Sequence, residues 1–202
     1  MNNSEPKKVS VIDILGENLP CSDLYERSYV HKELLTFILV AIKKDLVLTF
    51  SDEGVIKFWK KQYHLIEYIK TFKAHLGSIT CARFNDLQDK IYTTSPVDKS
   101  IKVFDLDTYD MVNIIKVEIP LISFCPTIGT SDLANQFIGV DREGSLYRID
   151  QACHLISGFQ KIVDLGWVDS HGFLVIVNSN GYVEYLDIQT LQFVSKDKNK
   201  VR

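Results

Sequence analysis

Short apolar runs separated by polar turns recur along the chain, and no long helical pattern with caps interrupts them. The first run of each group, such as 34–42 or 79–84, is nearly continuous in apolar residues. Such runs are expected of strands that are covered on both faces. Later runs include Lys, Glu and Asp, as expected of strands nearer an outer rim. The pattern predicts an all-β chain.

The apolar runs fall into four groups. The predicted strands are 34–42, 45–51, 55–60 and 65–72; 79–84, 90–95, 100–105 and 111–117; 121–125, 136–140, 145–150 and a weak one at 154–159; and 162–167, 173–177, 182–187 and 192–195.

One turn-and-strand pattern is written four times. Each copy ends on a bulky residue five places after the turn centre, and these residues are spaced by 45, 45 and 37 positions: Trp59, Phe104, Ile149 and Leu186. A period in this range, with a turn that leads into a short β-branched strand, is typical of propeller blades. The sequence therefore predicts a WD-repeat β-propeller with four blade-like units.

The expected organisation has three parts. Residues 1–18 form a lead whose strand at 9–15 would be available to close a ring. Residues 19–195 form the propeller segment, with blades at about 29–72, 73–117, 118–159 and 160–195. Residues 196–202 form a charged tail without core residues, which is expected to be mobile.

Four blades are fewer than most WD-repeat propellers have. About seven blades of 40–45 residues need roughly 300 residues, whereas the chain has 202. An open array leaves its end blades without neighbours. The alternatives are a truncated product, a half-propeller that self-associates, and a compact four-bladed ring; truncation is the favoured one.

Composition narrows the classes of partner. The net charge is −3, so no overall basic field attracts nucleic acid or an anionic membrane. The four cysteines show no paired spacing, which favours a reducing compartment. The longest apolar stretch, 34–42, has about half the length that spans a bilayer. A soluble intracellular protein is expected.

Part of the chain resembles a known family. Residues 19–32 (LPCSDLYERSYVHK), 54–61 (GVIKFWKK) and 72–77 (FKAHLG) are similar to the WD-repeat cyclophilins. The resemblance implies a propeller that precedes a C-terminal cyclophilin domain with peptidylprolyl isomerase activity. It also implies a nuclear location and spliceosomal protein partners. This sequence has no Phe-His-Arg triplet of a cyclophilin, so no isomerase residue is assigned.

WD-repeat blades carry a structural hydrogen-bond network that joins a His before the first strand, a Ser or Thr, a turn Asp and a Trp. By resemblance, the second blade offers His75, Ser95 and Asp98, while Phe104 replaces the Trp. The first blade offers His31, Ser51 and Trp59, with Glu53 at the Asp position. These six residues are the predicted network, and its predicted role is structural.

No motif for catalysis, cofactor or metal binding is present. The sequence lacks a Gly-x-Ser-x-Gly elbow, a phosphate-binding loop and a metal-ligand spacing among its five His. Candidate contact loops lie at 29–33, 75–78, 86–89 and 141–144. The sequence therefore predicts a non-catalytic protein–protein interaction scaffold. The alternatives are the N-terminal part of a peptidylprolyl isomerase and a self-associating half-propeller.

Overall fold

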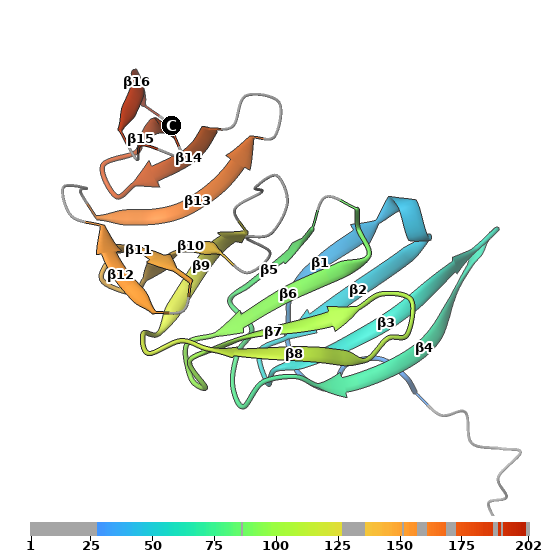
Figure 1. The fold of residues 1–202 in the computed structure, drawn as a ribbon. Coiled ribbons are helices and arrows are strands. Elements are labelled where there is room, and N and C mark those ends of the chain that lie inside the picture. Colours follow the sequence, from blue (N-terminus) through green and yellow to red (C-terminus); the bar gives the residue numbers. More distant parts are fainter. Residues whose placement is uncertain are drawn as a thin grey trace, which may run out of the picture. The chain divides into compact units, whose positions relative to one another are not determined.

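The computed structural model describes residues 28–85, 87–126, 136–150, 152–156, 161–168, 173–187, 190 and 192–200. These residues form four antiparallel sheets of four strands each. Within every sheet the strands follow chain order, and each strand pairs with the next (Figure 1). The predicted lead at 1–18, with its strand at 9–15, lies outside the described residues. The prediction of an all-β chain with four blade-like units is confirmed.

The strands have the following bounds. The first sheet contains β1 Leu35–Ala41, β2 Leu46–Ser51, β3 Val55–Gln62 and β4 Leu65–Lys73, with a one-turn 3-10 helix at Ile42–Lys44. The second contains β5 Cys81–Phe84, β6 Lys90–Ser95, β7 Ser100–Asp105 and β8 Met111–Lys116. The third contains β9 Leu121–Pro126, β10 Phe137–Asp141, β11 Leu146–Ile149 and β12 Cys153–Ile156. The fourth contains β13 Ile162–Val168, β14 Phe173–Asn178, β15 Tyr182–Asp187 and β16 Phe193–Lys200.

Residues 196–200 belong to a strand, where a mobile tail was expected over 196–202; residues 201 and 202 lie outside the described residues. Strand β16 continues through Lys200, with Lys196 opposite Glu184 and Asp197 opposite Val183 on β15. Strand pairing depends on backbone hydrogen bonds, and charged side chains are common on edge strands. The lack of core residues in this segment therefore did not prevent strand formation.

The turn between the second and third strands of each sheet contains one residue in the left-handed region. The φ angles are +83° at Gly54, +46° at Lys99, +83° at Gly144 and +78° at Gly181. Glycine adopts this conformation without strain because it has no Cβ atom, whereas Lys99 must accommodate its Cβ atom in it. The spacing of these turns is the repeat seen in the sequence.

The same turns fasten each of the first three sheets to the connection that follows it. Their carbonyl groups accept backbone hydrogen bonds from residues that follow the fourth strand: Gly54 from Ala74 (2.9 Å) and His75 (3.0 Å), Lys99 from Val117 (2.9 Å), and Gly144 from Ile162, the first residue of β13 (3.0 Å). A turn inside one sheet therefore positions the chain as it enters the next sheet.

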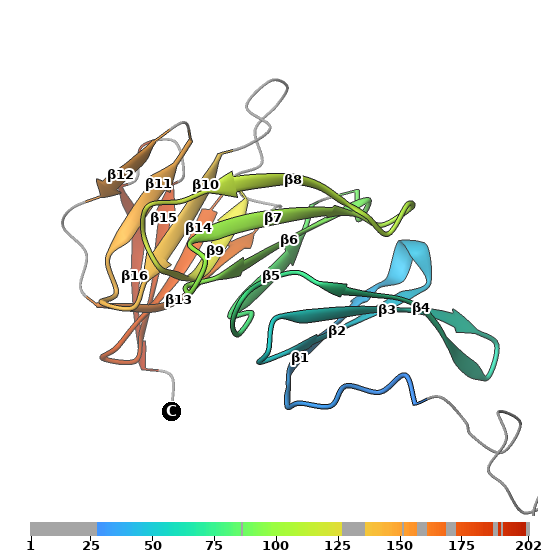
Figure 2. The same ribbon diagram turned by 90° about the horizontal axis from the view of Figure 1, so that it is seen from below.

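Alternating side chains divide each inner sheet between two hydrophobic cores. On β7, Phe104 packs in the core with residues of the first sheet, whereas Ile101 and Val103 pack in the core with residues of the third sheet. Successive side chains of a strand point to opposite faces, which explains this division. A third core joins the third and fourth sheets, which lie next to each other (Figure 2). The largest buried side chains of the three cores include Phe50, Phe58, Phe104, Phe124, Phe137, Ile138, Leu174 and Leu186.

Candidate functional site

A buried histidine lies where the first sheet leads into the second. His75 follows β4 and is almost completely enclosed. Its Nδ1 atom is 2.9 Å from Oδ2 of Asp98 in the turn between β6 and β7, and its Nε2 atom is 2.9 Å from Oγ1 of Thr93 on β6. The ring therefore joins the entry to the second sheet with a strand and a turn of that sheet.

The imidazole of His75 is neutral in this setting. Burial lowers the pKa of His75, and this effect outweighs the neighbouring Asp98 carboxylate, which acts in the opposite direction. With one ring hydrogen, the hydrogen-bond pattern assigns it to Nδ1, which donates to Asp98. Nε2 then accepts from the hydroxyl of Thr93. The His75–Asp98 contact is thus a charge-assisted hydrogen bond rather than an ion pair.

The ionic partner of Asp98 is Lys102, which the sequence did not single out. Nζ of Lys102 is 3.1 Å from Oδ2 of Asp98 and also donates to the backbone carbonyl of Ala74. Burial alone would raise the pKa of Asp98, but the hydrogen bond from His75 and the Lys102 ammonium lower it. His75, Thr93, Asp98 and Lys102 are called the His75 network below.

The hydroxyl in this network belongs to Thr93, where the sequence predicted Ser95. Both residues lie on one face of β6, because they are two positions apart. Ser95 is the last residue of the strand, and its Oγ accepts from the backbone N–H of Val97 in the turn (3.4 Å). Strand position therefore gives Ser95 a turn contact and gives Thr93 the histidine contact.

In the first sheet, too, a threonine rather than the predicted serine contacts the histidine. Nε2 of His31 is 2.7 Å from Oγ1 of Thr49, and the Trp59 indole donates to the same oxygen over 2.9 Å. The predicted partner, Ser51, instead accepts from the backbone N–H of Val55 (3.3 Å). Among the described residues, Nδ1 of His31 is buried without a hydrogen-bond partner, so no group here takes the part of Asp98.

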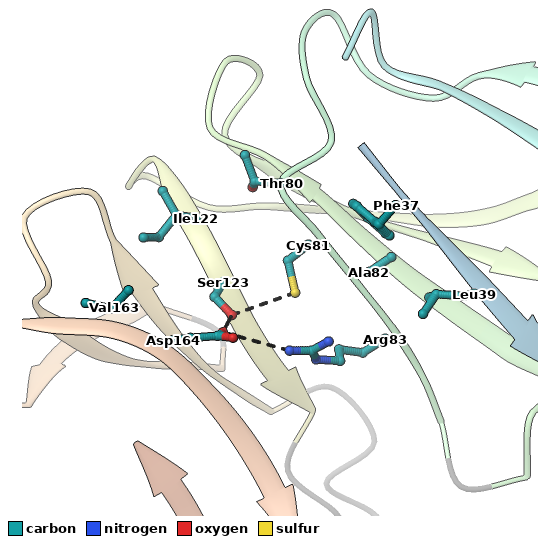
Figure 3. A pocket seen from close by; sticks show the side chains of 10 residues that line it. All are labelled: Phe37, Leu39, Thr80, Cys81, Ala82, Arg83, Ile122, Ser123, Val163 and Asp164. Atoms are coloured by element: carbon teal, nitrogen blue, oxygen red, sulfur yellow. Dashed lines mark hydrogen bonds and ion pairs between the residues drawn. The ribbon is translucent and has the colours of Figure 1, made fainter. Parts of the chain in front are cut away.

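A pocket opens between the first strands of the four sheets (Figure 3). It has a volume of about 430 Å³ and is called the first-strand pocket. Strands β1, β5, β9 and β13 and the residue before β5 supply its lining: Phe37, Leu39, Thr80, Cys81, Ala82, Arg83, Ile122, Ser123, Val163 and Asp164. All four sheets therefore contribute to one concave surface.

The polar part of this pocket contains groups of both charges. Ser123 donates its hydroxyl to Oδ1 of Asp164 over 2.7 Å, and Nη2 of Arg83 lies 3.9 Å from the same oxygen (Figure 3). The Arg83 side chain is 38% exposed and that of Asp164 is 60% exposed. Arg83 also donates to the carbonyl of Leu165 over 3.4 Å. The pair is thus solvent-accessible, and its long separation leaves both groups able to engage a ligand.

The pocket does not present an activated nucleophile. Burial raises the pKa of the Cys81 thiol, whereas a reactive cysteine needs a lowered one. Ser123 donates to Asp164 and has no histidine among the residues that line the pocket. These groups can form hydrogen bonds and ion pairs with a bound segment.

Within the described part of the chain, no three His, Cys, Asp or Glu side chains are arranged to hold a metal ion. His64 and His154 are exposed in separate sheets, and His171 lies outside the described residues. No helix within those same ranges is long and apolar enough to cross a membrane.

Sequence comparison relates about half of the chain to proteins named as peptidylprolyl isomerases. It is 40% identical over 101 residues to the peptidylprolyl isomerase domain and WD repeat-containing protein 1 of Pongo abelii, which covers 50% of this chain and 15% of that protein. It is 39% identical over 109 residues to the peptidyl-prolyl cis-trans isomerase cyp15 of Rhizopus delemar, covering 54% and 17%. It is 35% identical over 121 residues to the peptidyl-prolyl cis-trans isomerase 9 of Schizosaccharomyces pombe, covering 58% and 20%. The matched segment therefore spans at most a fifth of these relatives.

Structure comparison identifies the fold. No protein-family model matches the chain. The β-propeller domain of Cps50 (Swd1) from Myceliophteria thermophila superposes with a TM-score of 0.69 and 11% identity, covering 86% of this chain and 57% of that one. At this identity the likeness concerns the fold alone. The chain thus has the fold of a β-propeller, and about half of it is homologous to the peptidylprolyl isomerase domain and WD repeat-containing protein 1.

Proposed function

We propose that the chain is a non-catalytic protein–protein interaction scaffold. The observation that carries this proposal is the first-strand pocket, in which four sheets surround an accessible Arg83–Asp164 pair with apolar walls. Apolar surface with a few convergent polar groups is the usual composition of a binding site. The buried His75 network holds the loops of the second sheet and leaves no group there for a reaction in solvent.

The proposed setting is the nucleus, with spliceosomal proteins as partners. This part of the proposal rests on the resemblance of residues 19–32, 54–61 and 72–77 to the WD-repeat cyclophilins. Direct binding of nucleic acid or of a membrane is not proposed, because the net charge of −3 gives no overall attraction to anionic partners.

Affinity capture tests the scaffold role. The immobilised chain is incubated with nuclear extract of the source organism, and retained proteins are quantified by mass spectrometry. Arg83→Glu, which reverses the charge in the first-strand pocket, should lose a defined set of proteins. Lys61→Glu makes the same charge change on an exposed residue of β3 and should retain that set. An identical set from both variants would contradict a role for the pocket.

A second candidate is that this chain is the binding segment of a longer peptidylprolyl isomerase. Two observations favour it. The relatives are named as isomerases, and the matched segment covers only 15–20% of the length of each. An immunoblot of native extract distinguishes the two: a product well above 23.1 kDa supports this candidate. In both cases the isolated chain should leave the rate of Xaa-Pro isomerisation unchanged.

Self-association is a further proposal for the partner. Ile38 and Val40 on β1 are more than half exposed, and large exposed apolar side chains favour association. Light scattering over a concentration series tests it, because self-association requires a mass that increases with concentration. A constant monomer mass would exclude it.

A further inference from the structure

The second sheet carries a groove separate from the first-strand pocket. It has a volume of about 580 Å³ and is called the blade groove. The loop after β4, the turn before β7, and strands β7 and β8 with the segment after β8 supply its lining: Leu76, Asp98, Lys99, Ser100, Lys102, Ile114, Lys116, Val117 and Glu118. Because Asp98 and Lys102 also belong to the His75 network, one wall of the groove is held by buried contacts.

The groove exposes aliphatic side chains. Leu76 is 77% exposed and Ile114 is 46% exposed, and both lie in its lining. An aliphatic side chain of a ligand would bury this surface and gain the hydrophobic free energy that the isolated chain lacks. The preferred ligand therefore has at least one apolar side chain.

The charges of the groove favour an anionic partner. Asp98 and Lys102 compensate each other over 3.1 Å. The remaining charged lining residues are Lys99, Lys116 and Glu118, so positive charge exceeds negative charge by one. Lys99 and Lys116 are exposed, and Ser100 lies directly opposite Lys116 in the strand pairing. A carboxylate near this end of the groove would therefore meet two ammonium groups.

Ser100 is an independent indication of a ligand. It is only 4% exposed, yet its Oγ has no hydrogen-bond partner among the described residues. Buried hydroxyl groups are normally paired, since an unpaired one loses its hydration without compensation. A ligand carbonyl or carboxylate in the groove would accept the hydrogen of this hydroxyl.

We propose that the blade groove binds an acidic peptide segment of a partner protein. This inference rests on the proposed scaffold function and names the chemistry of one partner. An aliphatic side chain contacts Leu76 and Ile114, a neighbouring Asp or Glu carboxylate contacts Lys99 and Lys116, and a peptide oxygen accepts from Ser100. The exposed aliphatic surface favours a peptide over a free anion or the phosphate backbone of a nucleic acid, neither of which would cover Leu76 and Ile114.

The test uses three defined probes and the full chain. Each is a fluorescein-labelled heptapeptide in which Leu alternates with Glu, Gln or Lys, and binding is followed by fluorescence anisotropy. The Glu peptide should bind most tightly, and its affinity should fall as salt rises. Amide shifts of the isotopically labelled chain should map its contacts to 76, 99–102 and 114–118. Inorganic phosphate alone should produce no such shifts.

Charge reversal and a minimal hydroxyl deletion identify the residues. Lys99→Glu combined with Lys116→Glu should weaken the Glu peptide about tenfold and strengthen the Lys peptide. Lys116→Glu alone, at an exposed site, tests the same point if the double variant does not fold. Ser100→Ala should weaken binding by about two- to fivefold while the unfolding midpoint stays the same or rises. Lys61→Glu is the matched control and should bind like the original chain.

Three results would overturn the proposal. They are equal affinity for the Glu, Gln and Lys peptides, amide shifts outside the groove, and shifts with phosphate that match those of the peptide. A failure here leaves the scaffold function standing if Arg83→Glu still loses captured proteins. Conversely, the peptide could bind while Arg83→Glu captures the same proteins as the original chain. That result would overturn the role of the first-strand pocket and leave the proposal for the blade groove standing.

Discussion

Nδ1 of His75 lies 2.9 Å from the carboxylate of Asp98, although the two residues belong to different segments of the chain. His75 precedes the second sheet, and Asp98 lies in the turn between its second and third strands. The contact therefore joins the entry of the sheet to an internal turn. Lys102 completes the arrangement by neutralising the Asp98 charge.

Removal of the imidazole should destabilise the fold. His75→Ala leaves the partly buried Asp98 and the buried Thr93 without their shared partner, so the free energy of unfolding should fall by about 1–3 kcal/mol. His64→Ala, at an exposed position, should change it by less than about 0.5 kcal/mol. Urea unfolding of the three proteins measures both values. Equal effects at the two positions would contradict the network.

Stability should decrease below neutral pH. The pKa of His75 is lowered in the fold by burial, whereas an unfolded histidine titrates near 6.5. Unfolding therefore takes up a proton below about pH 6.5. The stability that the neutral His75 contributes is complete above this pH and is lost as the pH falls through the lower pKa of the folded state. Asp98 has a lowered pKa as well, and its contribution is lost below about pH 4.

Unfolding curves from pH 8 to pH 4 measure this dependence. His31 also has a lowered pKa from burial and acts in the same direction. The variant His75→Gln should therefore reduce the slope between pH 6.5 and pH 5 without abolishing it. An unchanged slope would mean that His75 titrates alike in the folded and unfolded chains.

The identity of the hydroxyl partner can be tested with two small substitutions. Thr93→Val keeps the side-chain shape and removes the hydroxyl that lies 2.9 Å from His75, so it should cost about 1–3 kcal/mol. Ser95→Ala removes only a 3.4 Å turn contact and should cost less than about 1 kcal/mol. Thermal or urea unfolding separates them. A larger loss for Ser95→Ala would favour the arrangement predicted from the sequence.

The turn glycine of the first sheet should not tolerate a side chain. Gly54 has φ of +83°, and an added Cβ would collide with the backbone carbonyl of His75. Gly54→Ala should therefore cost at least about 1–3 kcal/mol. At Gly166 on β13 an added Cβ would meet no atom within 4 Å, so Gly166→Ala should be neutral or slightly stabilising. Similar unfolding midpoints for the two variants would contradict this role of the turn.

The repeat of turns and strands could be predicted because it depends on local chemistry. Each left-handed turn residue sits at a fixed offset from the strand that follows, and the apolar runs mark the strands. The expected strand at 90–95 is β6, and that at 182–187 is β15. Strand β16 was predicted only over 192–195, and its continuation to Lys200 was missed because an edge strand needs few apolar residues.

The polar sites could be predicted only in part. His75 and Asp98 were identified from a family pattern, but Thr93 and Ser95 share a strand face, and the strand end decides which of them meets the ring. Arg83 and Asp164 are 81 positions apart in the chain. Their contact depends on which sheets lie together, and no local pattern encodes it. The only available signal was a charged residue in an otherwise apolar first strand.

Site-specific photo-crosslinking tests the interaction role of the first-strand pocket most directly. A benzophenone amino acid replaces Val163, an exposed lining residue of the pocket, or Leu65, an exposed residue of β4 outside it. After irradiation in nuclear extract, we expect position 163 to give discrete adducts with other proteins that position 65 does not give and that Arg83→Glu abolishes. The same adducts from both positions, or none from position 163, would contradict the interaction role.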